Sequence, residues 1–97
     1  MANTLPRWSQ DQAIAYEAAC EAVNDVIAGY SADIAAEQAK PAPDRNRIAY
    51  LEMRTDQCCA VLDALHVTDD VTIAQVRSEY GAIVRARAAA AHLADAA

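Results

Sequence analysis

The chain has 97 residues, of which 55% are hydrophobic, but most of that apolar content is small. Alanine occurs 25 times, whereas valine, isoleucine and leucine together number 18 and phenylalanine does not occur. So few large aliphatic side chains exclude a large enzyme core and a β-sandwich. No stretch approaches the roughly 20 apolar residues that a membrane span needs. The length allows a single domain, residues 1–97.

The formal net charge is -6, and the charge is unevenly distributed. Residues 1–39 carry six acidic side chains against one arginine, whereas residues 40–67 are neutral. A surplus of acid disfavours non-specific binding to a nucleic-acid backbone, because such binding depends on surplus Lys and Arg. The acidic segment serves solubility alone or, as the alternative, faces a basic protein partner.

The N-terminal segment has no apolar core followed by a cleavage site, so we expect no secretory signal. Cys20, Cys58 and Cys59 form no CxxC pair, and their number is odd. Both observations favour free thiols and a cytoplasmic location.

The pattern predicts a first helix over residues 9–39. Ser9 and Gln12 match a capping box, in which each residue bonds the backbone of the other. Medium-sized and aromatic residues then recur at spacings of three and four, which is a heptad pattern: Ala13, Tyr16, Cys20, Val23, Ile27, Tyr30 and Ile34. A second stripe of smaller residues runs beside the first and is interrupted only by Asp33: Ala15, Ala19, Ala22, Val26, Gly29 and Ala36.

Two further helices are expected over residues 44–66 and 70–92, after a proline-containing break and a second short break. Arg87 interrupts the apolar stripe of the third helix. Short loops make consecutive helices antiparallel. The fold class is therefore all-α, an elongated antiparallel three-helix bundle with coiled-coil-like heptad packing. Residues 1–8 and 93–97 are expected to be flexible.

The small-residue stripe suggests how the protein assembles. A thin core of this kind is commonly supplemented by oligomerisation. We therefore expect a homodimer through the first helix, with candidate interaction residues Ala15, Ala19, Ala22, Val26 and Gly29. The alternative is that both stripes are used inside one monomer, with the first helix at the centre.

Trp8 precedes the first helix and is the only tryptophan. We expect it to cover one end of the bundle. The alternative is that it anchors a partner, since tryptophan is enriched at binding hot spots.

The sequence contains no constellation typical of an enzyme. His66 and His92 stand without a motif, and neither phosphate-binding glycine loops nor zinc-ligand spacings occur. Carboxylate pairs such as Glu17–Glu21 fall on a polar helix face. We therefore expect no catalytic residues, no metal, no cofactor and no membrane association.

Seven arginines against one lysine are the best argument for nucleic acid. The candidate residues are Arg45, Arg47, Arg54, Arg77, Arg85 and Arg87. Acidic neighbours make ion pairing with the acidic first helix the preferred interpretation.

Residues 5–17 and 76–86 resemble stretches of small helical accessory proteins of bacterial mobile elements. The resemblance implies a bacterial cytoplasmic protein and no established activity. We therefore expect a non-enzymatic protein–protein interaction module, an accessory or adaptor protein. The alternative is a nucleic-acid-associated regulator that uses the arginines of the second and third helices.

Overall fold

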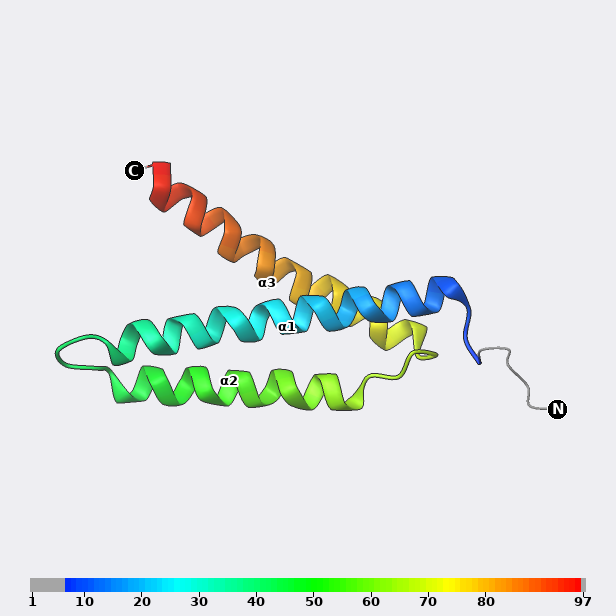
Figure 1. Ribbon diagram of the computed structural model, residues 1–97, viewed down its shortest axis with the longest axis horizontal. Helices are drawn as coiled ribbons and strands as arrows, with labels where there is room; N and C mark the ends of the chain where they lie inside the picture. Colours follow the sequence, from blue (N-terminus) through cyan, green and yellow to red (C-terminus); the bar gives the residue numbers. More distant parts are fainter. Residues whose placement is uncertain (1–6, 97) are drawn as a thin grey trace.

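The computed structural model describes residues 7–96 and shows an all-α protein (Figure 1). Its helices are α1 (Gln10–Gln38), α2 (Arg45–Ala64) and α3 (Asp70–Ala96). α1 packs against both other helices, and the molecule measures 64 × 29 × 21 Å. The predicted elongated three-helix bundle is confirmed, with α1 as its central helix.

The start of α1 follows from its first residues. The Ser9 hydroxyl accepts from the backbone N–H of Gln12 at 3.1 Å, and the Ser9 N–H donates to the Gln12 side chain at 2.9 Å. The predicted capping box is therefore present. The side-chain amide nitrogen of Gln12 also donates to the carboxylate of Asp70 at 3.1 Å, which ties the start of α1 to the start of α3.

The turn between α1 and α2 closes on Glu37, a buried carboxylate that the sequence analysis did not single out. Its oxygens accept from the Lys40 ammonium at 3.1 Å and from the Asp44 backbone N–H at 3.3 Å. Asp44 in turn caps α2 by accepting from the N–H of Arg47 at 3.1 Å. One buried acid thus joins the end of α1 to the cap of α2.

Asp69 precedes α3, and its carboxylate accepts from the backbone N–H of Thr72 at 3.1 Å. Hydrogen bonding from the Thr72 side chain, and then from its backbone, holds the pKa of Asp69 below its ordinary value. α3 then continues to Ala96. The expectation that the third helix ends at residue 92 is therefore wrong, because an alanine-rich run favours the continuation of a helix. The expectation of flexibility for residues 1–6 and 97 lies outside the described residues.

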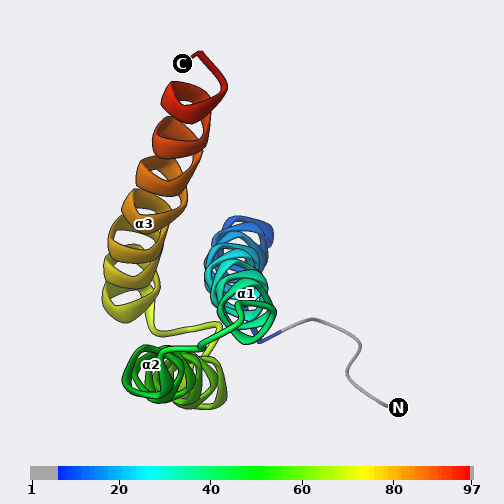
Figure 2. The same ribbon diagram turned by 90° about the vertical axis from the view of Figure 1, so that its left-hand side faces the viewer.

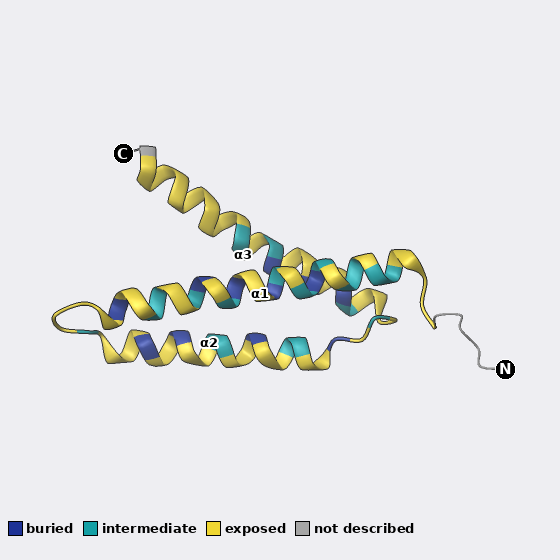
Figure 3. Cartoon of the chain, in the orientation of Figure 1, coloured by how far each residue is buried: buried dark blue, intermediate teal, exposed yellow. Residues whose placement is uncertain are grey.

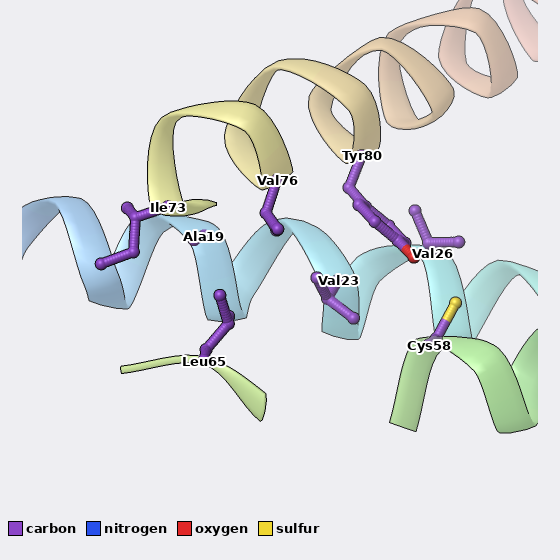
Figure 4. Packing of buried hydrophobic residues seen from close by; sticks show 8 residues of the cluster. All are labelled: Ala19, Val23, Val26, Cys58, Leu65, Ile73, Val76 and Tyr80. Carbon is purple, nitrogen blue, oxygen red and sulfur yellow. The ribbon is translucent and has the colours of Figure 1, made fainter. Parts of the chain in front are cut away.

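All three helices contribute to one cluster of buried residues in the core (Figure 4). Val23, Cys58 and Ile73 are its largest fully buried side chains. Burial raises the pKa of both the Cys58 thiol and the Tyr80 hydroxyl. The other members of this cluster are Ala19, Val26, Leu65 and Val76, and Ile48 and Leu51 of α2 are buried outside it.

α2 and α3 lie against different sides of α1, and nowhere in the described part of the chain do their backbones approach each other closely. Apolar packing holds only the first half of α3, because every residue from Arg85 to Asp95 is exposed (Figure 3). The second half of α3 accordingly rises away from the other two helices (Figures 1 and 2).

Two neighbouring residues of α3 test this division between core and surface. We expect Ile73→Ala to lower the free energy of unfolding by about 2–5 kcal/mol and the milder Ile73→Val by about 0.5–1.5 kcal/mol. The control Val71→Ala, at a position that is 79% exposed, should change it by less than about 0.5 kcal/mol. Urea denaturation measures all three, and equal losses at the two positions would contradict the packing.

Candidate functional site

The small-residue stripe of α1 lies inside the protomer from Ala15 to Gly29. Ala19, Val26 and Gly29 are buried, Ala15 and Ala22 are partly buried, and only Ala36, at the end of the stripe, is exposed. The neighbours of this stripe belong to α3, which places Ile73 and Ala74 beside Ala15, and Gly81 and Val84 beside Ala22. The arrangement is the alternative considered above, in which both stripes are internal. A second copy could reach the stripe only by displacing α3.

The two residues that interrupt the stripes meet each other. The guanidinium of Arg87 donates to both carboxylate oxygens of Asp33, at 2.8 and 2.9 Å. A Cβ at Gly29 would lie 3.1 Å from the Arg87 side chain, so the glycine lets that side chain lie close to α1. The hydrogen bonds from Arg87 hold the pKa of Asp33 below its ordinary value.

The candidate arginines do not form one basic face. Arg47 pairs with Glu37 at 3.7 Å, and Arg87 pairs with Asp33. Arg54 donates to the Tyr30 hydroxyl at 3.4 Å, and its guanidinium carbon lies 5.9 Å from the centre of that ring. The other three take part in no ion pair within the described part of the chain: Arg45, Arg77 and Arg85.

The solvent-exposed face of α1 carries acidic side chains and no basic ones. Asp11, Glu17, Glu21 and Asp25 are all exposed, and α1 contains no lysine or arginine. None of the ion pairs found between residues 7 and 96 involves these four carboxylates. Arg85 of α3 faces two of them across a groove of about 250 Å³. We call these four residues the acidic face.

Trp8 stands at the end of the bundle, where the α2–α3 turn passes the first turns of α1. It lines a pocket of about 450 Å³ together with Tyr16 and Glu17 of α1 and with Leu65, His66 and Val67 of the turn. The indole is 42% exposed, so it covers the bundle end only in part. The sequence analysis singled out Trp8 but not the turn residues, because helical periodicity does not say where a turn runs.

The described residues present no group that would hold a metal: nowhere among them do three His, Cys, Asp or Glu side chains come together in a suitable cluster. The carboxylate pair Glu52–Asp56 is exposed on α2, and His66 is likewise exposed. None of the helices in this part of the chain has both the length and the apolar content to cross a membrane.

Comparisons of the chain with protein-family models, with curated proteins and with solved structures find no significant match.

The Asp33–Arg87 pair predicts a specific dependence of stability on pH. A carboxylate with a lowered pKa in the folded state stabilises the protein above its unfolded pKa of about 3.9, and this contribution is lost as the pH falls through the folded value. Asp33→Asn removes this carboxylate. We therefore expect the free energy of unfolding to fall less between about pH 6 and pH 2 in the variant than in the wild-type protein. Asp25→Asn makes the same change on the exposed face of α1 and should retain the acid dependence of the wild-type protein. Urea denaturation at several pH values checks this, and parallel curves for Asp33→Asn and the wild-type protein would contradict it.

Proposed function

We propose that this chain is a non-enzymatic protein–protein interaction module that binds a basic protein through the acidic face of α1. The observation that carries the proposal is the charge of this face. Four exposed carboxylates lie on a helix that contains no basic residue. Complementary charge on a partner steers its approach and selects it over other proteins.

The other acids of α1 support this division of roles. Asp33 and Glu37, in the second half of the helix, hold the fold together through Arg87, Arg47 and Lys40. The acidic face lies in the first two-thirds of α1, and none of the salt bridges within the described part of the protomer involves its carboxylates. Its charge is therefore available to a partner.

A second copy of the chain is a less suitable occupant of α1 than a basic protein. The stripe expected to form a homodimer contact is covered by α3 in the protomer. A symmetric contact through the remaining exposed face would bring like charges together, which costs free energy. We therefore propose that the partner is a different, basic protein.

The alternative function, nucleic-acid binding, has less support from the geometry. Arg47 and Arg87 are engaged by acids of α1, and Arg54 is engaged by Tyr30. The arginines that remain do not offset the net charge of -6. A role as a small accessory protein, which the sequence resemblance implies, agrees with the proposed interaction module.

The proposal predicts that binding of a basic peptide depends on where acid is removed. A fluorescein-labelled hexa-arginine peptide, followed by anisotropy at low ionic strength, is the probe. We expect Glu21→Gln/Asp25→Asn to weaken binding about two- to thirtyfold, since exposed ion pairs contribute about 0.2–1 kcal/mol each. The matched control, Glu52→Gln/Asp56→Asn, removes the same charge at the same spacing from exposed positions of α2 and should weaken binding far less.

Equal losses in the two variants would mean that net charge, rather than the acidic face, binds the peptide. Absence of binding by the wild-type protein would also contradict the proposal. Binding of duplex DNA under the same conditions would favour the alternative function.

A further inference from the structure

The geometry points to the Trp8 pocket as the site that receives an arginine side chain of the basic partner. This inference rests on the proposed function and adds to it a defined anchoring point. The pocket lies at the end of the bundle and combines two aromatic rings, Trp8 and Tyr16, with the carboxylate of Glu17.

The pocket has suitable size and composition for such a side chain. Its volume of about 450 Å³ falls within the range of about 300–1,000 Å³ that is usual for ligand sites. Its wall contains two of the five aromatic residues of the chain, and Trp8 keeps 42% of its surface exposed. An indole left open in this way still has surface with which to bind a ligand.

The chemistry of the lining selects a planar cation. A guanidinium stacks on aromatic rings and forms paired hydrogen bonds with a carboxylate. Glu17 is the only acid that lines the pocket, and neither lysine nor arginine lines it within the described residues. Leu65 and Val67 supply apolar surface for the aliphatic stem of an arginine.

The position of Glu17 connects the pocket with the acidic face. Glu17, Glu21 and Asp25 are spaced four residues apart on α1 and are all exposed. Residues at this spacing are neighbours on a helix surface. A basic segment anchored in the pocket therefore continues along the acidic face, where its other basic side chains meet carboxylates.

Trp8 is the only tryptophan, so its fluorescence reports on this pocket alone. The probes are hexa-arginine and hexa-citrulline, which have nearly the same shape and differ in charge. We expect a saturable change of Trp8 fluorescence with hexa-arginine and none with hexa-citrulline.

Two variants test the residues. Trp8→Leu should weaken hexa-arginine binding, measured by anisotropy, about three- to thirtyfold through loss of the cation–π contact. Glu17→Gln keeps the fold and Trp8, and it should weaken the affinity for hexa-arginine, measured by Trp8 fluorescence, about two- to fivefold. The control Glu52→Gln removes the same charge from an exposed position of α2, outside both the pocket and the acidic face, and should leave the affinity and the Trp8 signal unchanged.

The outcomes separate the two proposals. In one outcome, hexa-arginine binding depends on Glu21 and Asp25, but Trp8 fluorescence does not change and the Trp8→Leu variant binds as tightly as the wild-type protein. This outcome would overturn the pocket and leave the acidic face as the binding surface. Equal responses to hexa-arginine and hexa-citrulline would show an apolar pocket without selectivity for a cation and would also overturn the inference. If hexa-arginine does not bind at all, both proposals fail.

Discussion

α1 contacts two helices that barely contact each other, and the rest of the structure depends on this arrangement. Small residues on one side of α1 let α3 approach closely, as at Ala19 and Gly29. Larger residues on a neighbouring side, Val23 and Tyr30 among them, face α2. Because two sides of α1 are occupied, only the third faces solvent, and that side carries the acidic face. The surface proposed for a partner is therefore what the packing of α1 leaves free.

The splay of α3 has an equally local explanation. Its apolar contacts with the rest of the protein end near Val84, after which the sequence offers mainly alanine and no large apolar side chain until Leu93. Arg87 spans the opening gap and reaches Asp33 through its long side chain. Beyond this ion pair, helix propensity alone maintains α3, because alanine needs no packing to favour a helix. Stability is consequently concentrated around Cys58, Ile73 and Tyr80.

Much of the fold could be predicted from the sequence, because caps and heptad spacings act locally. The capping box of Ser9 and the two stripes of α1 are examples. The partner of the small stripe could not be predicted, since spacing shows which residues are small but not whether the neighbouring helix belongs to the same chain. Asp33 and Arg87 each interrupt a predicted stripe, and only the structure shows that they meet. The Trp8 pocket could not be predicted either, because it depends on the path of the α2–α3 turn.

In this structure the small stripe of α1, from Ala15 to Gly29, packs within one protomer. The most direct test of this packing is the urea midpoint of Ala19→Val and of the wild-type protein, each measured over about a hundredfold range of protein concentration. We expect urea midpoints that do not depend on protein concentration, with the midpoint of the variant lower throughout, because added volume strains a closed core by about 1–3 kcal/mol. The contrary result is a urea midpoint that rises with protein concentration, with a difference between the variant and the wild-type protein that also changes with concentration. That result would place the stripe between two copies of the chain.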